Sequence, residues 1–130
     1  MAGTVSATAY EASGVGVISI AATGDASDGT FPDTALPALG GYLLALITNP
    51  GATAPTNNYD LTLIDADGLD RLQGVGANRS STISQEVAIV RSGTAIHPPV
   101  IAGETLTLNI DNNSVASAGI AIKIIYALGT

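Results

Sequence analysis

Residues 104–111, Glu-Thr-Leu-Thr-Leu-Asn-Ile-Asp, alternate polar and apolar side chains without a break. In an extended chain successive side chains point to opposite faces, so the apolar members share one face: Leu106, Leu108 and Ile110. After an Asn-rich turn, residues 118–128 repeat the pattern with a second shared apolar face: Ile120, Ile122, Ile124 and Tyr126. Two alternating runs joined by a short polar turn predict antiparallel strands that are each buried on one side.

The same period of two recurs toward the N-terminus. Further strands are predicted at five runs: 4–10, 14–22, 40–48, 59–65 and 82–91. Residues 14–22 shift their apolar face between Val17 and Ile18, which indicates a bulge or a strand buried on both sides. Residues 95–101 are extended but contain His97-Pro98-Pro99, so this segment is expected at the edge of a sheet or outside it.

Gly, Pro, Asn and Asp residues separate these runs. Asp67-Gly68 precedes an apolar run at 69–72, and because glycine accepts a positive φ, a hairpin is predicted there. The one helical candidate, residues 33–39, is weakened by Pro32 and Pro37. A sandwich and a barrel share this periodicity. The sequence favours an all-β, single-domain β-sandwich over residues 1–130, jelly-roll-like, with about eight or nine short antiparallel strands.

Composition and charge exclude several classes of function. Hydrophobic residues make up 46% of the 130 residues and are almost all aliphatic, which is enough for a buried core. Eleven acidic residues against four basic ones give a net charge of -7, so neither nucleic acid nor an anionic membrane is an expected partner. The chain has no cysteine, which excludes disulfides and thiolate metal sites. No secretory leader or membrane-spanning run is predicted.

The densest group of carboxylates is Asp65-Ala-Asp-Gly-Leu-Asp70. Its spacing matches the first half of a calcium-binding EF-hand loop, so the candidate Ca²⁺ ligands are Asp65, Asp67 and Asp70. The distal Glu of such a loop is missing, and the flanking runs are predicted as strands. The alternative is a hairpin turn in which aspartate caps the backbone and Gly68 takes a positive φ. Both interpretations remain open, and no other metal and no cofactor is expected.

No catalytic residues are predicted. His97, the single histidine, is expected on the surface or at an interface, because no partner for a general base can be inferred beside it. The sequence contains neither a Gly-x-Ser-x-Gly motif nor a phosphate-binding loop. The arginines are either tied to carboxylates or solvated on loops: Arg71, Arg79 and Arg91. The sequence therefore predicts a protein that is not an enzyme.

The middle and the end of the chain contain an ordered series of segments. An apolar strand ends in Asn49-Pro-Gly51, and Ala54-Pro-Thr-Asn-Asn-Tyr-Asp60 and the Asp65–Asp70 turn follow. Later come Gly103-Glu-Thr-Leu-Thr-Leu-Asn-Ile110, Asp111-Asn-Asn-Ser114 and a final apolar strand. In these segments, which span roughly residues 40–128, the chain resembles small β-sandwich virion proteins of tailed bacteriophages, of the capsid decoration or cement type.

The resemblance implies a structural role without enzymatic activity. It implies a homotrimer that binds the major capsid protein on the outside of the virion, after synthesis in the host cytoplasm. Two alternatives remain: another part of the phage particle, such as a neck, connector, tail or fibre module, and a Ca²⁺-dependent carbohydrate-binding module that uses the three aspartates. Residues 1–10 are uncharged and have strand character, so they form either an arm that adds to a partner's sheet or an ordinary first strand.

Overall fold

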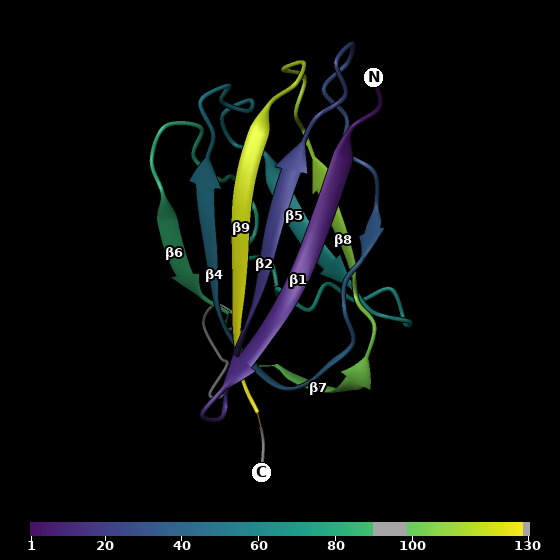
Figure 1. The fold of residues 1–130 in the computed structure, drawn as a ribbon, viewed down its shortest axis with the longest axis vertical. Coiled ribbons are helices and arrows are strands. Elements are labelled where there is room, and N and C mark those ends of the chain that lie inside the picture. The colour runs from purple at the N-terminus through teal and green to yellow at the C-terminus, as the bar shows by residue number, and fades with distance from the viewer. Residues whose placement is uncertain (90–98, 129–130) are drawn as a thin grey trace.

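The computed structural model describes residues 1–89 and 99–128, which form nine β-strands and no helix (Figure 1). The predicted all-β class and the predicted number of strands are confirmed. None of the described residues belongs to a helix long and apolar enough to cross a membrane. The strands are β1 Thr4–Ala12, β2 Val15–Thr23, β3 Thr34–Ala35, β4 Leu39–Pro50, β5 Asp60–Ile64, β6 Gln85–Ala88, β7 Val100–Glu104, β8 Thr107–Asp111 and β9 Gly119–Ala127.

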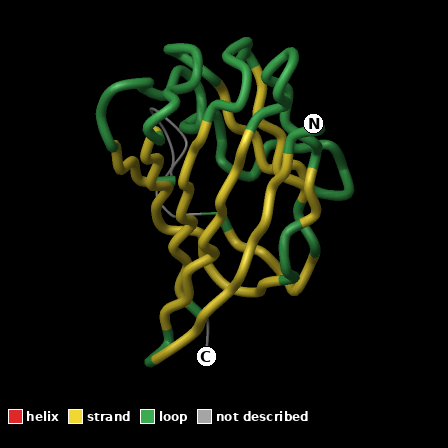
Figure 2. The backbone as a smooth tube through the Cα atoms, turned by 45° about the horizontal axis from the view of Figure 1, so that its top comes forward, coloured by secondary structure: helices red, strands yellow, loops and turns green. Residues whose placement is uncertain are grey.

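The strands form two antiparallel sheets with a common core between them (Figure 2). The larger sheet has the order β1-β2-β9-β4-β6, and β7 pairs with the first part of β4; the smaller sheet has the order β3-β8-β5. The pairs β2–β9, β3–β8 and β4–β7 are nested along the chain, each pair enclosed in sequence by the one before it. The predicted β-sandwich is confirmed, and its jelly-roll-like character stays a prediction. β6 departs from this nesting, because it pairs with β4 rather than with β5.

Alternation along the strands builds the core as predicted. The inward face of β9 is buried over its whole length, and Tyr126 at its end is 1% exposed. The predicted apolar face of residues 104–111 is buried as well, although Leu106 precedes β8 rather than belonging to it. Side chains from both sheets join one apolar cluster, which includes Ile18 and Ile20 of β2, Leu43 and Leu46 of β4, and Leu61 and Leu63 of β5.

The predicted irregularity in residues 14–22 is wrong. β2 pairs with β9 in one uninterrupted register, so it contains no bulge. It is also not buried on both sides, because Val15 is 47% exposed while Ile18 is fully buried. The apolar face changes between Val17 and Ile18 because β2 carries apolar residues on its outward side at this end.

The register shifts of the larger sheet lie in β4. One separates Leu39 from Gly40, and the other lies between Leu43 and Ala45. At the second shift Leu44 is the extra residue, and it is 38% exposed. Because of this bulge, Leu43 and Leu46 both face the core, although an unbroken alternation would place residues three positions apart on opposite faces.

Two shorter predictions are corrected by the structure. The Asp65–Gly68 turn forms, with Gly68 at a φ of 82°, but the returning strand predicted at 69–72 is reduced to a bridge between Ile64 and Asp70. The chain leaves the sheet there because Leu72 is buried in the core. The helical candidate at 33–39 contains the short strand β3, bounded by prolines on both sides.

The strand predicted at 82–91 is shorter in the structure, since β6 covers four residues. Part of that run, together with Arg91, His97 and most of the His-Pro-Pro segment, lies outside the described residues. The end of the segment predicted at 95–101 enters β7, which pairs with the edge of β4 as expected. Of residues 1–10, Thr4 to Tyr10 belong to β1 and pair with β2, as the alternative of an ordinary first strand predicts.

The bulge in β4 supplies a matched test of the core. Replacing Leu46, which is 0% exposed, by alanine should lower the free energy of unfolding by about 2–5 kcal/mol, since it removes buried methyl groups and leaves a cavity. Leu44→Ala, two residues away but 38% exposed, should cost less than about 1 kcal/mol. Urea unfolding followed by circular dichroism measures both, and equal losses would contradict the assigned bulge.

Candidate functional site

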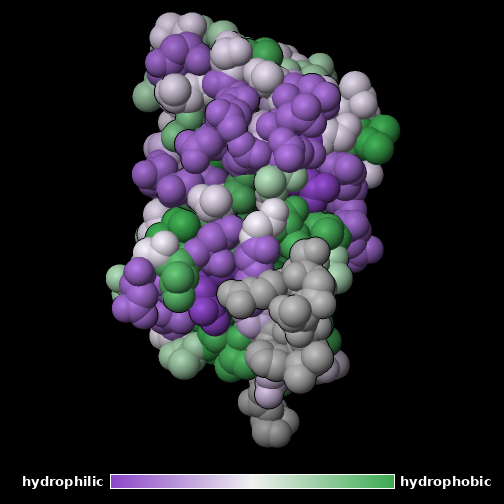
Figure 3. Space-filling view, turned by 180° about the vertical axis from the view of Figure 1, so that it is seen from behind, coloured by the Kyte–Doolittle hydropathy of each residue, from purple (hydrophilic) through white to green (hydrophobic). Residues whose placement is uncertain are grey.

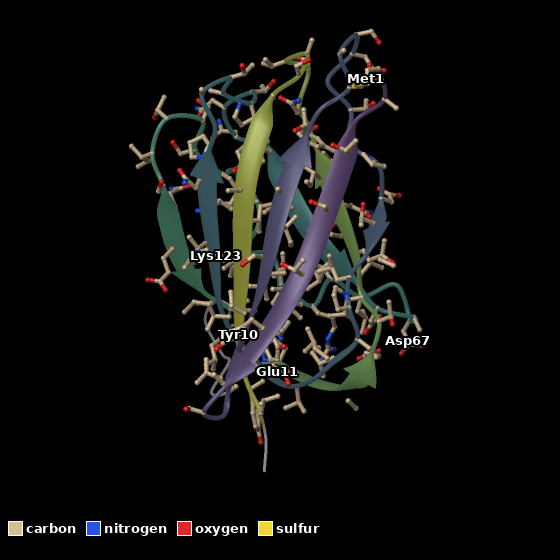
Figure 4. All side chains as sticks on the ribbon, in the orientation of Figure 1. Met1, Tyr10, Glu11, Asp67 and Lys123 are labelled. Carbon is tan, nitrogen blue, oxygen red and sulfur yellow. The ribbon has the colours of Figure 1, made fainter. Side chains whose placement is uncertain are left out.

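The outer face of the larger sheet is almost free of charge. We define it as the positions of β1, β2, β9 and β4 that point away from the core. These strands lie in front of the smaller sheet in Figure 1. Although the chain carries eleven acidic residues, none stands on the outward positions of these four strands, where the single charged residue is Lys123. Glu86 of the flanking strand β6 is exposed on the same side of the sheet, in register with Ile47 and Lys123. Figure 4 labels Lys123 partway along the sheet and Tyr10 nearer the β1–β2 turn.

Two rows of apolar residues cross this face at the end near the β1–β2 turn; we call them the apolar rows. The strand registers place one residue from each of five strands in each row. The first row is Tyr10, Val17, Ile125, Ala45 and Ala88. The second row is Ala12, Val15, Ala127, Tyr42 and Val100.

The apolar rows hold much of the exposed large apolar surface of the described residues. Tyr10 is 70% exposed, Val100 49% and Tyr42 41%, and Leu44 of the bulge lies at the same end of the sheet. A shallow hollow of about 270 Å³ lies between β1, β2 and Ile125. Contiguous apolar area of this kind on a folded surface is typical of a site that contacts another molecule.

The rest of the outer face is made mostly of small and hydroxyl-bearing residues, with Ile47, Asn49 and Lys123 among them. Thr8 of β1 lies opposite Ser19 of β2, which in turn lies opposite Lys123 of β9. A second shallow hollow, of about 240 Å³, is bordered by these side chains and by Ala21 and Ala121. No carboxylate among the described residues lies within salt-bridge distance of Lys123. This half of the face can therefore offer one ammonium group and several hydroxyls.

The opposite side of the molecule differs. Figure 3 shows hydrophilic surface over much of this side, where the smaller sheet and the long loops lie. Most of the acidic residues stand on these loops and at strand ends: Asp25, Asp28, Asp33, Asp60, Asp65, Asp67, Asp70, Glu104 and Asp111. The two remaining acids are Glu11 and Glu86, so most of the acidic charge lies away from the apolar rows.

The three aspartates predicted as Ca²⁺ ligands lie in one turn but have separate roles. Asp65 Oδ1 accepts hydrogen bonds from the backbone N–H groups of Asp67, at 2.9 Å, and Leu69, at 3.0 Å. The backbone N–H groups of Leu63, Leu72 and Gly74 bond to the carboxylate of Asp70. Among the described residues, no three His, Cys, Asp or Glu side chains are grouped so that they could hold a metal ion.

Asp60 and Asp111 form a second acidic group, which the sequence analysis did not single out as a site. They are directly paired at the ends of β5 and β8 and border a hollow of about 600 Å³ together with Asp70. Asp60 accepts hydrogen bonds from the backbone of Asn78, at 2.8 Å, and from the side chain of Asn112. These contacts tie three loops together, so the visible role of this carboxylate is structural.

The sequence left open whether the arginines pair with carboxylates or are solvated on loops, and the two described arginines differ in this respect. Arg71 lies 3.8 Å from a carboxylate oxygen of Asp65 and donates a hydrogen bond to the backbone oxygen of Val100, which links the turn to β7. Arg79 is 7% exposed and donates to the backbone oxygen of Val75 and to the side chain of Gln85 rather than to a carboxylate. Both arginines therefore hold loops in place.

A tyrosine–glutamate contact holds the β1–β2 hairpin in place next to its turn. The Tyr126 hydroxyl donates a 2.7 Å hydrogen bond to Glu11, and the Tyr126 ring covers Gly16, where a Cβ atom would overlap the ring. Burial raises the pKa of Tyr126 to about 12, with further contributions from the hydrogen bond and from the charge of Glu11. Glu11 is thus engaged on the inner face, and the outward positions of β1 carry no charged side chain.

The apolar rows were missed in the sequence analysis, although a signal was present. Val15 and Val17 alternate in phase with each other but out of phase with Ile18 and Ile20. That change of face was interpreted as an irregular strand, whereas it marks apolar residues on the solvent side. The burial of Arg79 was also missed, because its partners, the backbone oxygen of Val75 and the side chain of Gln85, follow no recognised sequence motif.

Comparisons with known proteins complete the description. No family model matches the sequence, and the curated proteins provide no match. Among solved structures, a chain of the "Cyanophage Pam1 capsid asymmetric unit" is similar to this chain, with 21% identity and a TM-score of 0.41. The alignment covers 98% of this chain and 87% of that chain. This similarity assigns no role to single residues, so the site rests on the geometry of this chain.

Asp70 should be the aspartate of the turn that matters most for stability. Asp70→Ala should lower the free energy of unfolding by about 1–3 kcal/mol, because three backbone N–H groups lose their acceptor. Asp67→Ala, at an exposed position in the same turn, should be nearly neutral. Urea unfolding measures both, and repetition with added Ca²⁺ tests the ligand hypothesis, since a resident ion would stabilise the wild type and not Asp70→Ala.

The raised pKa of Tyr126 predicts a loss of stability at alkaline pH. The ordinary pKa of tyrosine is 10.0 and that of Tyr126 is about 12, so the unfolded chain releases this proton first as the pH rises. The stabilisation is complete below pH 10 and is lost as the pH rises through 12. Tyr126→Phe should flatten this fall in urea unfolding between the two values, whereas the exposed Tyr10→Phe should not. Parallel curves for wild type and Tyr126→Phe would contradict it.

Proposed function

We propose that the protein is a non-enzymatic structural component of a bacteriophage virion, a decoration or cement protein that binds the outer surface of the major capsid lattice. One observation carries the proposal: the outward positions of β1, β2, β9 and β4 hold no acidic residue and end in the apolar rows, on a chain with a net charge of -7. The acid on this side of the sheet, Glu86, stands on the flanking strand β6. An enzyme needs a cluster of reactive groups, whereas a binding protein needs a surface of this kind.

The size of the outer face suits a protein partner. Four strands about 4.8 Å apart, each rising about 3.4 Å per residue over nine residues, present roughly 600 Å². A stable protein–protein interface covers roughly 800 Å² on each partner, so most of one could rest on this face. The chemistry of the face also defines the partner, which would offer apolar side chains opposite the apolar rows and a carboxylate near Lys123.

The sequence resemblance to phage virion proteins supports the class of particle. The segments that carry it have structural roles in this fold: residues 41–49 lie in a central strand, Asp70 organises a turn and residues 119–127 form β9. The net charge of -7 on the chain also disfavours adhesion to the packaged genome. The homotrimer implied by the resemblance stays a prediction.

The alternatives are supported by fewer features. A neck, tail or fibre module would use the same outer face, so the two proposals differ in location and not in chemistry. A Ca²⁺-dependent carbohydrate-binding module would need free oxygens on the predicted ligands. The oxygens of Asp70 and one oxygen of Asp65 already accept backbone hydrogen bonds, which leaves few ligand positions.

Binding to particles tests the proposal. Purified protein is mixed with phage heads that lack it, and the heads are imaged by cryo-electron microscopy while bound protein is measured by co-sedimentation. We expect regular density over the capsid surface. Val15→Lys should weaken binding about 10-fold or more, because it places a charge in the middle of an apolar contact.

Leu69→Lys is the matched control, since Leu69 is 57% exposed against 47% for Val15 but lies in the Asp65–Asp70 turn. This variant should bind as the wild type does. Density confined to one vertex or along the tail would replace the capsid-surface role by the neck, tail or fibre role. No binding to heads or tails would overturn the virion proposal, and equal loss in both variants would reject the outer face as the contact.

A further inference from the structure

Strand β1 is the one long open edge among the described strands. It is nine residues long and pairs with β2 alone, and no other described residue forms a backbone hydrogen bond with it. The other edges are short or covered. β3 has two residues, β6 four and β7 five. The free side of β5 is covered by backbone hydrogen bonds from Arg71 to Leu63 and from Leu61 to Gly76.

β1 has only one of the usual protections of an open edge, an inward charge next to the end of the strand. Proteins block such edges with proline, lysine, a bulge or an inward charge, because unpaired backbone groups otherwise bind another strand. β1 contains no proline and no lysine, and its register with β2 is continuous. Its single charged residue is Glu11, which faces inward and accepts a hydrogen bond from Tyr126.

We propose that a second copy of this chain pairs with β1 through its own β1, in antiparallel orientation, with Thr8 at the two-fold axis. This register uses all nine residues of both strands. On the outer face it pairs Thr8 with Thr8 of the other copy, and on either side Ser6 with Tyr10 and Thr4 with Ala12. On the inner face it pairs Ala7 with Ala9 and Val5 with Glu11.

Electrostatics allow this contact even though each chain carries a charge of -7. No cross-strand pair in the proposed register joins two like charges, which would be unfavourable. The two Glu11 side chains would lie six residues apart along the pairing, roughly 20 Å, which is beyond the screening length of about 8 Å at physiological salt. The acidic loops lie away from the outer face, and Glu86, the acid on the outer side of the larger sheet, stands on β6 at the edge opposite β1.

The pairing joins the two larger sheets into one, with both outer faces on the same side. This inference does not depend on capsid binding, because it concerns the isolated protein. It departs from the trimer implied by the sequence resemblance, since antiparallel pairing of one strand with its own copy generates a two-fold axis and hence a dimer.

Oligomeric mass and charge complementation test the proposal. Wild-type protein is measured by analytical ultracentrifugation over concentrations from about 10 µM to about 1 mM, where a weak edge contact would be populated. We expect a species of twice the 12.9 kDa chain mass whose fraction rises with concentration. Thr8→Lys and Thr8→Glu should each remain monomeric, because each places like charges opposite one another. An equimolar mixture of the two variants should restore the dimer.

Thr105→Lys is the control, since Thr105 is also exposed but lies between β7 and β8. It should associate as the wild type does, and circular dichroism should show the same fold for every variant. A wild type that stays monomeric over the whole range would overturn the proposal. So would any oligomer, trimer included, whose mass Thr8→Lys leaves unchanged, or a mixture of the two charge variants that fails to associate.

Discussion

The structure depends on the insertion of the last strand, β9, between β2 and β4. β9 pairs along nearly its whole length on both sides, so segments distant in sequence must come together before the larger sheet exists. Its inward residues, among them Ile122 and Tyr126, form the middle of the core. Since side chains alternate, burying this set also directs Lys123 and Ile125 outward. The register of β9 with β2 and β4 therefore determines which residues lie in the core and also which lie on the outer face.

The fold does not require the outer face to be apolar. Strands buried on one side tolerate threonine, serine or lysine on the other, and the far half of this face has that composition. At the hairpin end, Val15, Tyr10 and Tyr42 expose apolar area that contributes little to the core. Aspartates elsewhere in the chain have visible structural reasons, such as the turn held by Asp70. The apolar rows have no such structural reason among the described residues of the monomer, and this favours a binding role for them.

The sequence predicted what depends on local alternation and missed what depends on distant partners. The faces of β8 and β9 were predicted correctly because each residue's direction follows from its neighbours. The strand order could not be predicted, since periodicity does not state which strand lies beside which. The bulge at Leu44 was missed, because residues 42–47 are all apolar and so have no unique alternation. At the candidate site, Val17 followed by Ile18 was ambiguous for the same reason, since both faces of β2 are apolar there.

The separation of charge and apolar surface favours particular orientations of contact. Repulsion between acidic loops acts over about 8 Å at physiological salt, so it opposes any approach that brings two loop-bearing sides together. An approach through the outer face or through the edge of β1 meets few acids. Glu11 faces inward toward Tyr126, and Glu86 stands on β6 at the edge opposite β1. These two surfaces share Tyr10 and Thr8, which lie on the outer face and on the open strand at once. Copies joined at β1 would hold their outer faces side by side, so a lattice that bound one copy would bind its neighbour at a raised effective concentration.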